Sequence, residues 1–328
     1  GGVVRIEAAG NVTVNGAINA DGLKAPWVNA GGGSGGSVWI SCRALAGTGG
    51  VVTARGGVAG TGGSPNGNGG GGRVAIDYDA ETQRAVGRPD ITFSTLPGMR
   101  ATGRPADVGT LRFPDAQFLE GNVQPRLSGH LAIPGFDAWS LDHLTVSNVW
   151  LRLSNTGFSL TVSNALLIAG SEGRLDLGGD AFLYEPAETG GRGYSHINYS
   201  DTPNLLSLTC GGNLSLTNGG SLAAYAARTN GQTMAHGARV CVAGELTIGT
   251  NCTLTASSHP SNGGSVLWQV GSLTLAGASS RFSADVQGFP GGYSATLSRG
   301  FGPGGGGVRC GGSHGGKAGD YNSGAAAT

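Results

Sequence analysis

The sequence predicts an all-β chain folded as a parallel β-helix, a solenoid with long glycine-rich loops on one face. Three short apolar patterns recur along the chain in a fixed order. Glycine supplies 65 of the 328 residues and clusters between these patterns. Helix-favouring runs are almost absent, and β-branched residues with a period of two fill the patterns. Each observation favours repeated short strands over helices.

The first pattern places apolar residues on either side of one variable residue. It occurs at 4–6, 38–40, 74–76, 206–208, 240–242 and 266–268. The second pattern is apolar, Thr or Ser, apolar, and it occurs at 12–14, 144–146, 160–162, 214–216, 246–248 and 273–275. The third is apolar, any residue, Ala, and it occurs at 18–20, 52–54, 222–224, 254–256 and 282–284. Three strands in this order make one predicted coil.

Alternation along a strand sends the outer two residues of each pattern inward and the middle residue toward solvent. A single coil cannot bury its own strand edges. Stacking coils about 4.8 Å apart pairs the backbone groups of each coil with those of its neighbours, which gives the solenoid.

The spacing between coils varies, and the variation falls almost entirely after the third pattern. The inserted stretches include 23–37 and 56–72, both rich in glycine. Insertions at one point of the coil map to one face of the solenoid. Glycine would let these loops stack in extended, polyglycine-like rows, and a floppy loop is the alternative.

The chain divides into four predicted parts. Residues 1–86 form glycine-rich coils, and 87–139 form an irregular, proline-containing transition. Residues 140–205 form shorter coils with an excursion at 180–204. Residues 206–328 form glycine-rich coils that end in a glycine-rich extension.

Charge and motifs exclude several partners. Charged residues make up 12% of the chain and balance to a net charge of zero, which argues against nucleic acid. No apolar run is long enough to span a membrane. Residues 311–318 approach a phosphate-binding loop, but Ala318 replaces the required Ser or Thr. The six histidines lack metal-ligand spacing, so we expect no cofactor or metal.

The cysteines are few and widely separated. They are candidates for disulfides, but an odd number leaves one thiol free or bonded between chains. They are Cys42, Cys210, Cys241, Cys252 and Cys310.

Residues 31–57 and 69–79, with the later pieces 109–113, 144–148 and 166–179, carry a family resemblance. They resemble the glycine-rich cassette of large exported bacterial β-helix proteins, often adhesin-like or surface-associated. The resemblance implies a multi-coil solenoid and an extracellular or cell-surface location. It supplies no catalytic residues.

In such proteins, a stretch like 300–328 precedes a coil like the one that begins at 1–6. We therefore expect either one period of a longer protein or identical chains that meet end to end.

These observations together predict a non-enzymatic structural subunit of a bacterial extracellular fibre or surface layer. It would self-assemble head to tail through its end coils, with residues 4–6 stacked beyond the coil that begins at Val266. The candidate interface residues are Val4, Ile6, Val12, Val14, Val266, Trp268, Leu273 and Leu275.

Two alternatives stay open. A polysaccharide-binding adhesin could use exposed aromatic residues, with candidates Trp27, Trp39, Tyr194 and Tyr199. A polysaccharide lyase or glycosidase could use acids mounted on stacked strands. The candidates are Arg174, Asp176 and Asp180, joined across coils by Asp137, Asp142 and Asp201. Asp176 lies between two leucines, so we expect it to point outward as a surface acid.

Overall fold

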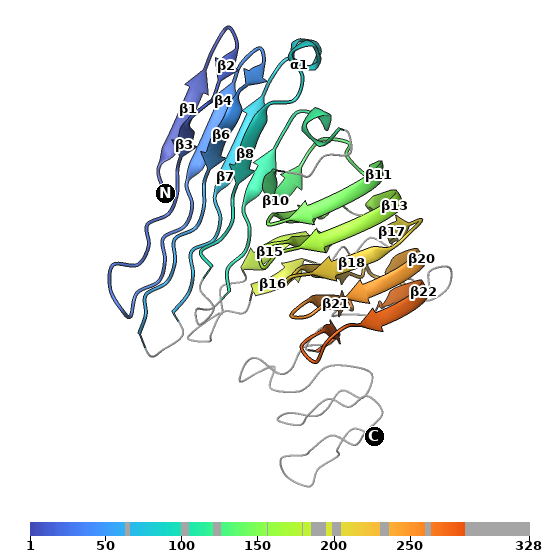
Figure 1. Ribbon diagram of the computed structural model, residues 1–328. Coiled ribbons are helices and arrows are strands. Elements are labelled where there is room, and N and C mark those ends of the chain that lie inside the picture. Colours follow the sequence, from blue (N-terminus) through green and yellow to red (C-terminus); the bar gives the residue numbers. More distant parts are fainter. Residues whose placement is uncertain are drawn as a thin grey trace.

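The structure is a computed structural model, and it is mostly β, with almost all strand pairs parallel (Figure 1). It describes residues 1–62, 66–99, 105–120, 126–155, 157–178, 180–184, 195–198, 205–229, 236–259 and 264–285. The predicted all-β class with parallel strands is confirmed.

A sheet of 13 strands runs through the molecule from β1 to β23. Its main path contains β1 (Val3–Glu7), β4 (Ser37–Ser41), β7 (Arg73–Asp77), β9 (Thr110–Arg112), β10 (Leu127–Ala132), β12 (Trp150–Leu153), β14 (Arg174–Leu177), β19 (Ser221–Tyr225), β21 (Thr253–Ser257) and β23 (Arg281–Ser283). A side branch joins at β10 and contains β3 (Ala17–Asn19), β6 (Thr48–Thr53) and β8 (Asp90–Ser94).

A second parallel sheet of six strands occupies the C-terminal half. It contains β11 (Ala138–Ser147), β13 (Ser159–Ala169), β17 (Leu206–Cys210), β18 (Leu214–Thr217), β20 (Ala238–Ile248) and β22 (Val266–Leu275). Two small sheets complete the described strands. They pair β2 (Val12–Thr13) with β5 (Leu45–Ala46), and β15 (Asp180–Tyr184) with β16 (Ser195–Asn198). The β15–β16 pair is antiparallel and lies within the predicted excursion at 180–204.

The strands alternate in burial as the sequence predicts. In β4, Val38 and Ile40 are fully buried, whereas Trp39 between them faces outward and is partly exposed. The register aligns Val38 with Val4 on one side and with Val74 on the other. Apolar side chains therefore stack in rows, and these rows form one continuous core.

One described α-helix, α1 (Ala80–Val86), covers part of the N-terminal half. Its first turn is capped by Asp79, whose carboxylate accepts a 2.8 Å hydrogen bond from the Thr82 amide. The buried Gln83 side chain accepts from the Leu45 amide at 2.7 Å and donates to the Leu45 carbonyl at 3.0 Å. The helix thereby satisfies the amide and the carbonyl of Leu45 in β5.

The range 87–139, expected to be irregular, contains strands that continue the large sheet. Strands β8, β9 and β10 lie in it, together with a 3-10 helix at Gln117–Leu119. Phe93, Phe113 and Phe118 form an aromatic cluster there, with ring centres 5.1 to 6.0 Å apart. Their bulk fills the core where the two halves of the molecule meet.

The large sheet is built from different sequence patterns in the two halves of the chain. The first pattern falls on β1, β4 and β7 of the large sheet in the N-terminal half. In the C-terminal half the first pattern falls on β17, β20 and β22 of the six-stranded sheet, and the third pattern continues the large sheet through β19, β21 and β23. Equivalent patterns therefore do not all lie in the same sheet along the chain. A tripeptide pattern sets which side chains point inward but not which strand lies beside it.

The glycine-rich stretches extend side by side from one side of the N-terminal half (Figure 1). Successive stretches bond to one another through the backbone, as in the 2.7 Å bond from the Gly22 amide to the Arg55 carbonyl and the 2.8 Å bond from the Gly56 amide to the Leu96 carbonyl. The described parts of 20–36, 54–72 and 95–109 form this glycine layer.

Bonds in the glycine layer also run between the outgoing and returning arms of each stretch. The Gly33 amide donates to the Leu23 carbonyl at 2.9 Å within the first stretch, and the Gly69 amide donates to the Gly57 carbonyl at 2.9 Å within the second. The Gly57 amide in turn donates to the Gly33 carbonyl of the neighbouring stretch at 2.7 Å. The backbones approach so closely that a Cβ added to Gly57 would lie 2.0 Å from the Leu23 carbonyl oxygen. Backbone bonds hold the layer together and such positions require glycine, which agrees with the predicted polyglycine-like rows and not with the floppy-loop alternative.

Candidate assembly surfaces

At the C-terminal end of the described chain, the last side chains of the apolar core rows are exposed because no further described strand covers them. Leu246 and Ile248 in β20 are both 0% exposed. Their neighbours in the next strand, Leu273 and Leu275, are 44% and 49% exposed, although they occupy the same rows. Side chains that would be core in an interior strand thus face outward along the stack.

Two aromatic residues complete this C-terminal surface. Trp268 follows the fully buried Val240 in its row, and Phe282 follows the fully buried Leu254. Their rings lie 5.2 Å apart in an edge-to-face arrangement. The indole nitrogen of Trp268 is buried and has no hydrogen-bond partner. With Val266, Leu273 and Leu275, these two residues form what we call the C-end surface.

The N-terminal end is open in the same way. Val4, Ile6 and Val12 are only partly buried against the core. Val14, also a predicted interface residue, is buried at 5% exposure because it lies further under the next repeat. The predicted interface residues therefore all lie in end strands or directly beside them, and we call the N-terminal group the N-end surface.

The first glycine-rich stretch extends the N-end surface with three exposed apolar side chains. Trp27 is 75% exposed, and Leu23 and Val28 are similarly open. The Ala25 amide bonds to the Val58 carbonyl at 2.9 Å, so this stretch lies on the second one. The sequence indicated Trp27 as a sugar-binding candidate, but its place at the end of the glycine layer also suits assembly.

Charged side chains lie on the outward face beside the N-end surface. The Arg5 guanidinium lies 4.5 Å from the ring centre of Trp39, and Arg5 also pairs with Glu7 on its own strand. The Trp39 indole in turn donates to Asp77 at 2.8 Å. Trp39 is thus engaged in a ladder across β1, β4 and β7.

A second group of charges is buried where the large sheet crosses the middle of the molecule. Asp176 is fully buried and accepts from the Trp150 indole at 2.7 Å, from Arg174 at 2.7 Å and from Arg152 at 3.1 Å. The other side of Arg152 pairs with Asp107. The expectation of a surface acid at Asp176 is wrong: the side chain does point away from the leucine core, but it meets Trp150 and two guanidinium groups instead of water.

Burial and charge shift the pKa values of this cluster in both directions: burial raises the pKa of Asp107 despite its pairing with Arg152, whereas the pKa values of Asp176 and His130 are lowered. Burial alone would raise the pKa of Asp176, but Arg174 and Arg152 outweigh it and hold that pKa below its usual value. Burial and the charge of Arg152 lower the pKa of His130 to about 4, and the neutral imidazole hydrogen-bonds to Ser154. The arrangement is a satisfied ion network that holds β10, β12 and β14 together.

The other acids proposed to join Asp176 bond to other residues. Asp137 accepts from the Asn155 side chain at 3.2 Å, and Asp142 bonds to Asn164 and to His143. Both acids lie on or beside the six-stranded sheet. The side chain of Asp180, and Tyr194, Tyr199 and Asp201 entirely, lie outside the described residues.

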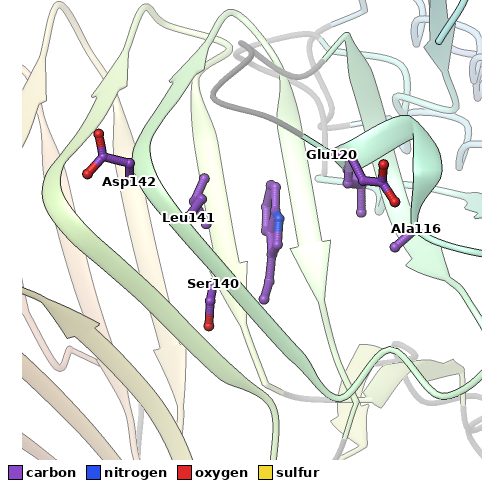
Figure 2. Close-up of a pocket in the computed structure, with 7 residues that line it drawn as sticks. Ala116, Glu120, Ser140, Leu141 and Asp142 are labelled. Carbon is purple, nitrogen blue, oxygen red and sulfur yellow. The ribbon is translucent and has the colours of Figure 1, made fainter. Parts of the chain in front are cut away.

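A pocket of about 400 Å³ lies between the 3-10 helix and β11. Figure 2 shows Ala116 and Glu120 on one side, and Ser140, Leu141 and Asp142 on the other. Leu119 and Trp139 complete the lining. Among these described lining residues there are two carboxylates and no basic group, which suits a small neutral or cationic ligand better than an anion.

The four described cysteines, Cys42, Cys210, Cys241 and Cys252, are free thiols. Burial raises the pKa of the Cys42 and Cys210 thiols. Cys310 and the near phosphate-loop match at 311–318 lie outside the described residues.

No group of three or more potential metal-binding side chains occurs in the part of the chain that the structure describes. In the same part, no helix has the length and apolar character needed to cross a membrane. Comparison with protein-family models, with curated proteins and with solved structures gives no match to this chain.

Proposed function

We propose that the chain is a structural subunit that assembles head to tail into an extracellular fibre or surface layer, with its parallel sheets wound as a β-helix. The observation that carries the proposal is the opening of the core rows at both ends. Leu246 and Ile248 in β20 are 0% exposed. Leu273 and Leu275, which follow them in the same rows, are each nearly half exposed. An end of this kind offers both apolar area and unpaired strand groups to another subunit.

Other features support assembly over the cleavage or binding of a polysaccharide. The acids suggested for polysaccharide cleavage bond to different partners, and Asp176 is neutralised within a buried ion network. The ordered glycine layer adds a broad, stiff backbone surface instead of a binding loop. The extracellular location and the bacterial origin of the proposal rest on the sequence resemblance.

The proposal is tested by imaging the purified chain by negative-stain electron microscopy over a range of concentrations. We expect filaments from the unmodified chain. The double variant Leu273→Glu/Leu275→Glu should remain dispersed, because two carboxylates on the C-end surface would have to be buried at the junction without partners.

A matched control is Val86→Glu, which changes another exposed apolar residue, 45% exposed, on α1 away from both ends. It should still form filaments. Dispersed particles from the unmodified chain at every concentration, or unchanged filaments from the double variant, would overturn the proposal.

A further inference from the structure

The two outer edges of the large sheet, β1 and β23, define how subunits would join. In its main path, β1 and β23 each pair with a single strand within the described residues. Strand β22, by contrast, belongs to the six-stranded sheet, whose other edge, β11, begins in the middle of the molecule. A subunit that continues the large sheet must therefore place its β1 against β23 and not against β22, which specifies the strand within the coil that begins at Val266.

The register of the large sheet is constant from one edge to the other. One outward-facing residue of each strand lies directly opposite one of the next strand, with no shift in register along the main path. The row is Val3, Ser37, Arg73, Thr110, His130, Arg152, Asp176, Ala223, Thr255 and Ser283. Val3 and Ser283 are thus the two ends of a single row.

We infer that the partner at the C-end surface is a second copy of this chain, joined so that its Val3 lies opposite Ser283 in a parallel β1–β23 pair. This inference rests on the proposed function and specifies its junction. The large sheet then runs from subunit to subunit without a break in register.

Side chains around this register are complementary. One step along the strand brings Phe282 opposite Gly2, where an added Cβ would meet nothing within 4 Å, so the ring has room. Two steps the other way bring the exposed Asp285 opposite Arg5, an acid against a base. The alternative pairing of β1 with β22 offers neither match.

The remaining strands follow from the order of strands along the chain. After β1, the chain continues to β2 and β3, whereas β22 precedes β23. A β1–β23 pair therefore sets Val12 and Val14 toward the row of Trp268, and Ile18 toward Leu273 and Leu275. These are the residues whose rows are cut open at the two ends.

Crosslinking between differently labelled subunits tests the register. Subunits carrying Val3→Cys are mixed with subunits carrying Ser283→Cys, allowed to assemble, and treated with a short bismaleimide. We expect a covalent dimer at twice the 32.5 kDa subunit mass. Each single variant alone measures the background from the native thiols.

The matched control mixes Val3→Cys with Leu267→Cys, which places the second thiol on β22 at a position facing away from the core rows. This mixture should give only background. Filaments that crosslink through Leu267→Cys, or that fail to crosslink through Ser283→Cys, would overturn the register while leaving the proposed function intact. Absence of filaments in electron micrographs would overturn both.

Discussion

Asp176 points away from the leucine core, yet it is fully buried and bonds to three side chains from two strands. Its carboxylate pairs with the guanidinium groups of Arg152 and Arg174, and it accepts a hydrogen bond from the Trp150 indole, while Asp107 supplies the second negative charge. Arg174 stacks 4.0 Å from the centre of the Trp150 ring, so the cluster is packed as well as charge-balanced. Removing one member of such a buried network leaves the others uncompensated.

We therefore expect Asp176→Asn to lower the free energy of unfolding at neutral pH by about 3–5 kcal/mol, measured by urea denaturation. Because the carboxyl pKa is lower in the folded than in the unfolded chain, its stabilisation is present above the unfolded pKa and is lost as the pH falls through the folded one. The difference between variant and unmodified chain should accordingly shrink in acid.

Asp137→Asn is the control for this prediction, because Asp137 is exposed and accepts a hydrogen bond from Asn155 near the surface. It should change stability by less than about 1 kcal/mol. Equal effects of the two substitutions would show that the buried network contributes nothing beyond an ordinary surface acid.

At the level of elements, the glycine layer depends on backbone-to-backbone contact and not on side-chain packing. Its arms bond in two directions, to the next stretch and to the opposite arm of the same stretch. Gly57 makes one bond of each kind: its amide donates to Gly33 in the neighbouring stretch, and its carbonyl accepts from Gly69 in the opposite arm of its own stretch. Any side chain at such a position must push a neighbouring backbone away.

We expect Gly57→Ala to destabilise the chain by at least about 2 kcal/mol in urea denaturation, because its Cβ would lie 2.0 Å from the Leu23 carbonyl oxygen. Gly67→Ala is the matched control in the same stretch, since a Cβ there would meet nothing within 4 Å. It should lie within about 0.5 kcal/mol of the unmodified chain. A tolerated Gly57→Ala would contradict the packed layer.

The sequence predicted the strands well because alternation is local. The apolar residues of each pattern do point inward, as Val38 and Ile40 illustrate. It could not predict the burial of Asp176, since the groups that cover the carboxylate come from separate strands. The spacing of Arg174 and Asp176 on one face was the only local signal of that network.

For the whole molecule, the sequence predicted the repeated strands but not which pattern joins which sheet. The strands that continue the large sheet come from the first pattern in one half and from the third pattern in the other. The change occurs around β8, β9 and β10, where β10 pairs with both β8 and β9. Pairing between strands far apart in the sequence decides which pattern continues the large sheet, and a three-residue pattern carries no information on that pairing.

The unbroken row from Val3 to Ser283 has a consequence for the periodicity of an assembled filament. The row crosses ten strands of the large sheet. At a strand spacing of about 4.8 Å, identical subunits would recur every 48 Å or so along the sheet, and bending of the sheet would shorten the axial distance. Fibre diffraction should then show the strand spacing together with a meridional reflection from an axial rise per subunit no longer than this, and a longer rise would contradict the β1–β23 junction.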